Sequence, residues 1–356
     1  MIAAHVPVAV SVPVQAQQAQ SLAQAAVPAR RPVAVMPLVA ADYQVHALHR
    51  EDHAWVQKNC YVDVWIETLH ALGLAPEAML GFTVALAFEG DQWTFFKPPH
   101  RDLAELYGIE VEELNVWRGN ILHHALHHVA EGKLVLTEAD AFWMPDTAGT
   151  DYREQHTKST IVINAIDMER KRLGYFHNAG YFELAGEDFE HLFRLGYPHD
   201  PGFMPFFAEF ARVDRLRRLP PQALVATSVK LLRSHLARLP AANPIARFAA
   251  QFPNDVAWLQ AEGLSLYHRY AFATLRQLGA NFELAGSYLG WLSAHGETGL
   301  EGAQSAFQDI SSGTKALLLK TARAVNTGRA VQFHELLHDM AAAWTLGTDS
   351  LKQRYP

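Results

Sequence analysis

The sequence is poor in several features, and each shortage excludes a class of protein. Its one cysteine is Cys60, so a disulfide within the chain and a cysteine-rich metal site are both excluded. The net charge is −7, which argues against a nucleic-acid-binding protein with its usual basic surface. No apolar run reaches the ~18–20 residues that cross a membrane. We therefore expect no nucleic-acid partner and no membrane span.

The N-terminal stretch lacks the features of a signal peptide. No Lys or Arg precedes its apolar part, which Pro7 and Pro13 interrupt, and a segment rich in Ala and Gln follows. A signal peptide would begin with a basic region. We interpret residues 1–40 as a disordered or extended tail and expect a cytoplasmic protein.

The remaining chain is typical of a packed globular protein, with 49% hydrophobic and 19% charged residues. Residues 45–200 mix helix and strand patterns. Residues 203–350 form a second region that is almost continuously helical up to residue 347. Breaks are expected there at Pro220, Pro221, Pro240, Pro244, Pro253 and the glycine-rich stretch 296–302. The two regions predict two domains, the second of them all-helical.

Helical patterns come first in residues 45–200, and strand patterns follow. Apolar residues recur at helical spacing in 61–72, and Gly73 stands where a glycine ends many helices. We also predict helices over 102–107 and 110–130. Short β-type runs occupy 133–138, 157–166, 173–176 and 181–184. This order predicts an α+β fold with an antiparallel sheet.

Cys60 directly precedes the predicted helix. A helix N-terminus presents unpaired N–H groups and a positive partial charge, which favour a thiolate. His156 opens one predicted strand and Asn178 closes the next. A hairpin of these strands would place the Asn178 amide beside the imidazole and fix its tautomer. The order Cys, His, Asn is that of papain-like enzymes.

Three stretches carry a family resemblance: NCYVDVWIETLHALG, FWMPDTAGTDYREQHTKSTIVINAID and RLGYFHNAGYFEL. They resemble an uncharacterised bacterial family of unknown function, found near genes for amino-acid:carrier-protein ligases. The same region is more distantly similar to the papain-like acyltransferase of butirosin biosynthesis. The resemblance implies a papain-like domain in which Cys60 is the nucleophile, His156 the base and Asn178 the orienting group.

One position departs from the papain-like pattern. The glutamine that supports the oxyanion usually stands six residues before the cysteine, where this chain has Ala54. Gln57 is the nearest candidate, with Asn59 also in reach. The loop 143–152 leads into His156 and should border the cleft, with Asp146 or Asp151 able to hold a substrate amine. A purely structural turn is an equal alternative for this loop. We count Trp143 and Tyr152 among its substrate-binding candidates.

Two histidine patterns suggest metal binding at first sight. His334 and His338 match H-E-x-x-H, but Trp344 stands where a third histidine would follow. His123, His124, His127 and His128 form i,i+4 pairs beside an apolar line. We interpret both segments as amphipathic helices with a solvated polar face, and expect no metal.

We therefore expect a cysteine-dependent acyltransferase. It would take an aminoacyl group from the phosphopantetheine thioester of an acyl carrier protein and pass it to a small-molecule or protein acceptor, with no cofactor of its own. Alternatives are a papain-like hydrolase of an amide or thioester, a non-catalytic carrier-protein-binding module and, less favoured, a zinc peptidase. A basic stretch offers a docking surface for an acidic carrier protein; its members are Arg215, Arg217, Arg218, Lys230, Arg233 and Arg238.

Overall fold

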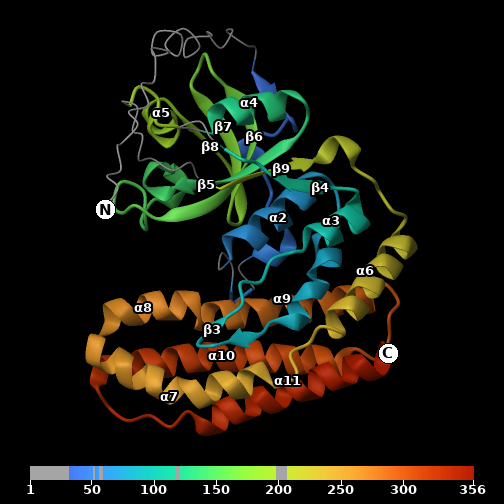
Figure 1. The fold of residues 1–356 in the computed structure, drawn as a ribbon, viewed down its shortest axis with the longest axis vertical. Helices are drawn as coiled ribbons and strands as arrows, with labels where there is room; N and C mark the ends of the chain where they lie inside the picture. The colour runs from blue at the N-terminus through green and yellow to red at the C-terminus, as the bar shows by residue number, and fades with distance from the viewer. Residues whose placement is uncertain (1–31, 51–52, 56–58, 117–120, 198–206) are drawn as a thin grey trace, which may run out of the picture.

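The computed structural model describes residues 32–50, 53–55, 59–116, 121–197 and 207–356. Mixed α and β elements form the N-terminal part, and six helices stack beneath it to form the C-terminal part (Figure 1). The fold is thus α+β with an antiparallel sheet and a helical C-terminal region. Within the described residues, no helix has the length and apolar character needed to span a membrane.

One seven-stranded sheet organises the N-terminal part, and all its described pairings are antiparallel. The strand order is β4-β9-β5-β6-β7-β8, and β1 also pairs with β6. The strands are β1 (Val33–Ala34), β4 (Glu110–Glu113), β5 (Leu134–Asp140), β6 (Lys158–Asp167), β7 (Arg172–His177), β8 (Gly180–Ala185) and β9 (Ala208–Arg212).

The two faces of the sheet carry different helices, because successive strand residues point to opposite sides. Val162 and Phe176 belong to the core cluster that includes α2 (Cys60–Ala71). Ile161 and Tyr175 belong to a second cluster, formed with α4 (Leu122–Ala130) and α5 (Glu187–Leu192). Residues 159–163 therefore alternate between a face covered by α2 and a face covered by α4.

Smaller elements complete this part: α3 (His100–Tyr107) and the hairpin β2 (Phe88–Glu89) and β3 (Gln92–Trp93). The 3-10 helices are η1 (Ala40–Asp42), η2 (Ala47–His49), η3 (Pro76–Ala85), η4 (Ala141–Trp143), η5 (Pro145–Thr147) and η6 (Val213–Arg215). The C-terminal helices are α6 (Pro221–Leu236), α7 (Pro244–Glu262), α8 (Leu264–Ala273), α9 (Leu275–Ala294), α10 (Glu301–Thr327) and α11 (His334–Arg354).

The helix expected over 61–72 is α2, and Gly73 follows its end with φ of 68°. The four predicted β-type runs correspond to β5, β6, β7 and β8. Three expectations are wrong. Residues 110–113 form the edge strand β4, and the helix there covers only Leu122–Ala130. The strand β9 lies within the region expected to be helical, and its place between β4 and β5 overrides local propensity. Pro253 lies inside α7 and does not end it.

Residues 1–40 are also partly ordered. Val33 and Ala34 pair with the end of β6, and Met36 N donates to the Asn164 side chain at 2.9 Å. The first 31 residues of that expected tail lie outside the described part of the chain.

The helical part contacts the N-terminal part through buried polar groups. Ser228 Oγ donates to Ala78 O at 2.8 Å, and Asn281 Nδ2 donates to Thr83 O at 2.8 Å. His235 Nε2 lies 2.6 Å from Asp102 Oδ2, and both side chains are 1% exposed. These buried hydrogen bonds, together with a shared hydrophobic core, join the two parts into a continuous packed unit.

Candidate functional site

The first turn of α2 is held by Asn59. Its side chain accepts a hydrogen bond from Val62 N at 3.1 Å and donates one to Phe96 O at 2.8 Å. Its backbone N–H donates to Asp63 Oδ2 at 3.2 Å. Asn59 is therefore a helix N-cap, and Cys60 is the first residue of the helix. The sequence prediction of Cys60 at a helix start is confirmed.

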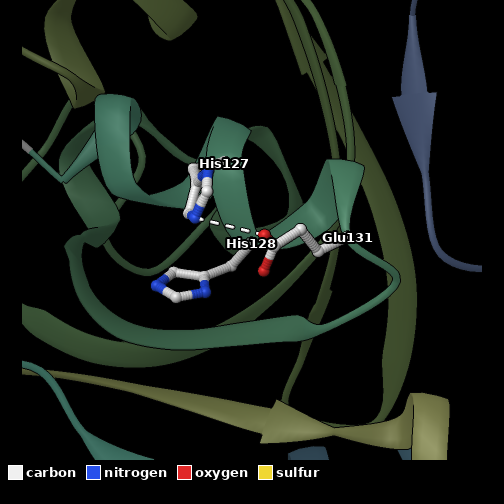
Figure 2. A group of neighbouring side chains, drawn as sticks. All are labelled: His127, His128 and Glu131. Atoms are coloured by element: carbon white, nitrogen blue, oxygen red, sulfur yellow. Dashed lines mark ion pairs between the residues drawn. The ribbon is translucent and has the colours of Figure 1, made fainter.

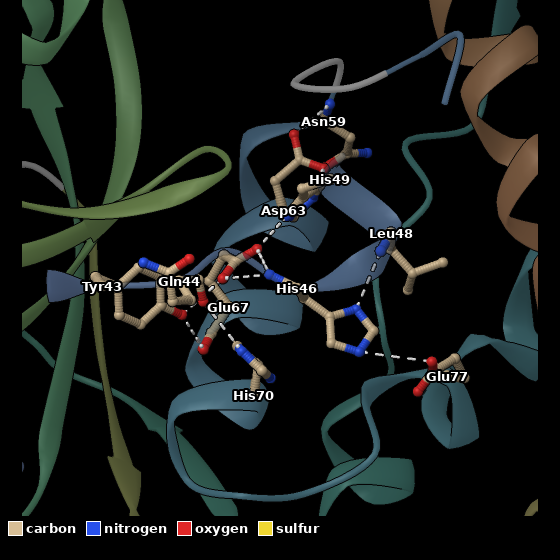
Figure 3. A network of polar contacts seen from close by, with 10 residues as sticks. All are labelled: Tyr43, Gln44, His46, Leu48, His49, Asn59, Asp63, Glu67, His70 and Glu77. Atoms are coloured by element: carbon tan, nitrogen blue, oxygen red, sulfur yellow. Dashed lines mark hydrogen bonds and ion pairs between the residues drawn. The ribbon is translucent and has the colours of Figure 1, made fainter. Parts of the chain in front are cut away.

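A buried network lies along the side of α2 (Figure 3). His49 Nδ1 is 2.5 Å from Glu67 Oε1, and His49 Nε2 is 3.3 Å from Asp63 Oδ1. Tyr43 OH donates to Glu67 Oε2 at 2.6 Å. Burial on its own lowers the pKa of His49, but the hydrogen bonds to Asp63 and Glu67 outweigh it and raise that pKa to about 9. The protonated ring thus joins η2 to the helix that carries Cys60.

Cys60 is half-buried and lines a cavity of about 280 Å³. Cys60 Sγ lies 3.5 Å from the hydroxyl of Thr160 on β6. Lys97 and Lys158 also line the cavity, and Lys158 Nζ pairs with Glu138 Oε1 at 2.6 Å. The thiol therefore faces a hydroxyl, in a cavity that is also lined by two lysines and by the Glu138 carboxylate.

A polar cluster follows Cys60 on the same helix. Tyr61 OH donates to Glu209 Oε2 at 2.7 Å and lies 2.9 Å from His100 Nε2. Burial tends to raise the pKa of Glu209, but hydrogen bonds from His100 and Tyr61 lower it overall. Lys97 Nζ lies over the Tyr61 ring at 5.1 Å. This cluster joins α2 to α3 and β9 beside the cavity.

The structure does not bring His156 and Asn178 together, contrary to the sequence prediction. Ile161 pairs with His177, so Asn178 lies at the level of Thr160, in the turn between β7 and β8 with φ of 44°. Four residues of chain separate that level from His156, which lies two residues before β6, a span of up to about 13 Å at about 3.3 Å per residue. His156 opposite Asn178 would require a turn centred on residue 167, whereas Asp167 still pairs with Arg172 and the turn follows it.

His156 has a different acidic partner and lies apart from Cys60. Its Nδ1 is 2.6 Å from Asp140 Oδ2, and its ring stacks on Phe142 with centroids 4.4 Å apart. The His156 side chain is 69% exposed. Because Cys60 contacts Thr160 instead, the described residues contain no Cys-His-Asn triad at this cavity.

The remaining predicted site residues are Gln57 and three residues of the loop 143–152. Gln57 lies outside the described residues. The Trp143 ring stacks on His191 with centroids 4.0 Å apart, and Tyr152 OH donates to Asp188 Oδ2 at 3.0 Å. The backbone N–H of Asp151 donates to Thr147 O at 3.0 Å within the loop. These contacts hold loop 143–152 in place. Trp143, Asp151 and Tyr152 are not among the residues that line the Cys60 cavity.

Asp146 belongs to a second constellation, which sequence reasoning missed. Asp146 Oδ2 lies 2.5 Å from His177 Nδ1, and Ser159 Oγ lies 2.7 Å from His177 Nε2. Tyr175 OH donates to the other oxygen of Asp146. The strand period of two residues was the signal in the sequence that could have found this grouping. It puts residues 159 and 161 on one face of β6, and residues 175 and 177 on one face of β7.

The described residues contain one cluster with three possible metal ligands, namely His127, His128 and Glu131 (Figure 2). Glu131 already pairs with Lys133 at 2.5 Å and with His127 at 3.4 Å. Burial, followed by the nearby Lys133, lowers the pKa of His128 to about 4. The carboxylate already has Lys133 and His127 as partners, and we assign no metal to this cluster.

The H-E-x-x-H histidines lie in the helical part. The His334 and His338 rings are parallel with centroids 6.1 Å apart. Both line a largely apolar cavity of about 430 Å³ between α7 and α11. They join no cluster of three candidate ligands within the described residues, so nothing here supports the zinc peptidase alternative.

These observations define a two-part α+β protein with a cysteine at a helix start, packed against an antiparallel sheet. Two family models match the sequence: the DUF1839 N-terminal domain over residues 44–213 and the DUF1839 C-terminal domain over residues 221–353. The chain belongs to this uncharacterised family. No curated protein matches it.

Proposed function

We propose that this protein transfers an acyl group carried as a thioester, with Cys60 as the nucleophile in a papain-like domain. The observation that carries the proposal is the position of Cys60, first in a capped helix and half-buried at a cavity. The N–H groups of the first turn favour an anion there. A helix bearing a cysteine and packed on an antiparallel sheet also fits the papain-like resemblance.

Among the described residues no imidazole lines the Cys60 cavity, which favours thioester chemistry over amide hydrolysis. A thiolate attacks the carbonyl carbon, the new C–S bond forms, the old C–S bond breaks, and the departing sulfur keeps the electron pair. This exchange needs no proton on the leaving group. An amide nitrogen must be protonated as it leaves, which requires a general acid. Thr160 at 3.5 Å is a poor substitute for that acid.

The cavity lining suits a carrier protein's prosthetic group. Phosphopantetheine ends in a thiol and carries a phosphate. Lys97 and Lys158 supply cations at the cavity, and Phe95 and Phe207 supply apolar surface. A carrier-bound aminoacyl thioester is therefore the donor we propose, with a small molecule or a protein as acceptor.

One observation favours a second candidate, a non-catalytic module that binds a carrier protein. The residue facing the sulfur is Thr160, a side chain that does not act as a base at neutral pH. In that case the cavity would hold the pantetheine arm without forming a covalent bond.

Incubation with aminoacyl-loaded carrier protein separates the two candidates. We expect intact-mass spectrometry to show the aminoacyl mass on the wild-type chain and its loss in Cys60→Ala. Thr160→Ala serves as a matched control that alters the same cavity but keeps the thiol. Binding of the carrier by wild type and Cys60→Ala alike, with no adduct on either, would reject acyl transfer and support the binding module.

A further inference from the structure

Ser159, His177 and Asp146 form a connected chain of polar groups on the sheet face opposite Cys60. The Asp146 carboxylate can only accept hydrogen bonds, so the hydrogen between it and His177 must sit on Nδ1. His177 Nε2 is then an acceptor, and the Ser159 hydroxyl donates to it at 2.7 Å. The tautomer is thus determined by the contacts themselves.

We propose that Ser159 is a second nucleophile, with His177 as its general base and Asp146 as the positioning residue. The three side chains have the connectivity of a Ser-His-Asp triad, which is recognised by geometry and not by sequence order. Its substrate class is an activated acyl group, an ester or a thioester. This assignment is independent of Cys60.

The burial of the three side chains suits a general base that is held in place and a nucleophile that solvent can reach. The side chains of His177 and Asp146 are 2% and 4% exposed, whereas Ser159 is only half-buried. Tyr175 OH donates to the second oxygen of Asp146 and fixes the carboxylate in place. By its register Ser159 presents its hydroxyl on the α4 face of the sheet, so an acyl group would approach it from that face and not through the Cys60 cavity.

Ser159, His177 and a water molecule account for every bond and proton in the hydrolysis of an acyl group. The Ser159 oxygen bonds to the acyl carbon while its proton passes to His177 Nε2. The bond from that carbon to the ester oxygen or thioester sulfur breaks, and the leaving group takes the proton from His177. Water then repeats the step and releases the acid.

A fluorophosphonate probe tests the nucleophile directly, because the serine oxygen displaces fluoride from phosphorus and His177 takes the proton. We expect one probe per chain on Ser159 by peptide mass spectrometry. Labelling should be lost in Ser159→Ala and unchanged in Cys60→Ala and in Ser305→Ala, an exposed serine on α10. Asp146→Asn should slow labelling by at least about 10²-fold, because the amide no longer holds the required tautomer.

A thiol at position 159 separates catalysis from a merely structural hydrogen bond. In Cys60→Ala/Ser159→Cys the new thiol is the only one in the chain, and His177 should keep its alkylation by iodoacetamide fast below pH 7. Cys60→Ala/Ser305→Cys is the control, and its rate should fall about tenfold per pH unit below ~8. Identical pH profiles for the two thiols, or a folded wild type whose Ser159 takes no probe, would overturn the proposal.

Discussion

The buried His49 makes the stability of this protein depend on pH in a direction that can be stated in advance. Hydrogen bonds to Asp63 and Glu67 raise its pKa from 6.5 to about 9, against the lowering effect of burial. A raised pKa means that the protonated ring is favoured in the folded state. Its contribution is therefore complete below about pH 6.5 and is lost as the pH rises through 9.

The size of this effect follows from the same values. A pKa that rises from 6.5 to about 9 corresponds to about 3 kcal/mol, at about 1.4 kcal/mol per pH unit. The His49 side chain is 2% exposed, so little solvent screening reduces the figure. We expect the stability difference between wild type and His49→Gln to shrink by about 3 kcal/mol from pH 6 to pH 10.

Urea unfolding followed by tryptophan fluorescence, to which the buried Trp65 on α2 contributes, measures this difference at each pH. Taking wild type minus variant cancels the titration of the common groups that His49 does not contact. His70→Gln is the matched control for removing a nearby imidazole, because His70 contacts the backbone oxygen of Gln44 and not a carboxylate pair. A His49→Gln difference that stays constant or grows with pH would refute the reasoning.

Two further substitutions test local packing by urea unfolding. Asn59→Ala removes the bond to Val62 N and should cost about 1 kcal/mol of unfolding free energy; an unchanged midpoint would contradict the cap. Gly279→Ala places a Cβ 2.3 Å from the Trp55 ring and should cost about 1–3 kcal/mol. Gly302→Ala, on a helix with open space around its Cβ, should instead stabilise by about 0.5–1 kcal/mol.

The elements that sequence predicted well are those with strong periodicity. The helix after Asn59 and the strand containing 159–163 each bury one or both faces against a core, so their patterns are long and clear. The strand Ala208–Arg212 is short and contains two alanines, and it becomes a strand only because β4 and β5 lie on either side. That information is tertiary and is absent from a local window of sequence.

In the candidate site, too, the local features were predictable from the sequence and the features that depend on strand register were not. The capped helix start at Cys60 depends on neighbours within four residues, and sequence could identify it. The pairing of His156 with Asn178 depended on the register of a hairpin, and a shift of four residues separated them. Register also created the contact of Ser159 with His177, two residues that no motif links. Strand register is determined by the turn and by burial, so the local sequence did not determine it.

The helical part also helps to position the segment that leads to Cys60. Glu283 on α9 accepts hydrogen bonds from the backbone N–H groups of Ala54 at 2.8 Å and Trp55 at 3.0 Å. The Trp55 indole donates to Ser311 on α10 at 2.9 Å. The chain five residues before Cys60 is thus anchored on helices more than 200 residues away in the sequence, so the helical part helps to position the approach to Cys60.

Glu283→Gln tests this anchoring with a change of only one atom. The carboxylate accepts both N–H groups, whereas an amide presents its NH₂ to one of them, so one bond is lost and two donors face each other. The loss should be about 1.5–3 kcal/mol locally. We expect faster trypsin cleavage at Arg50 and an altered alkylation rate of Cys60, with no change for the exposed Glu335→Gln on α11. If Glu283→Gln leaves both rates at the wild-type value, the segment is held by Trp55 alone, and α9 contributes packing without directing the approach to Cys60.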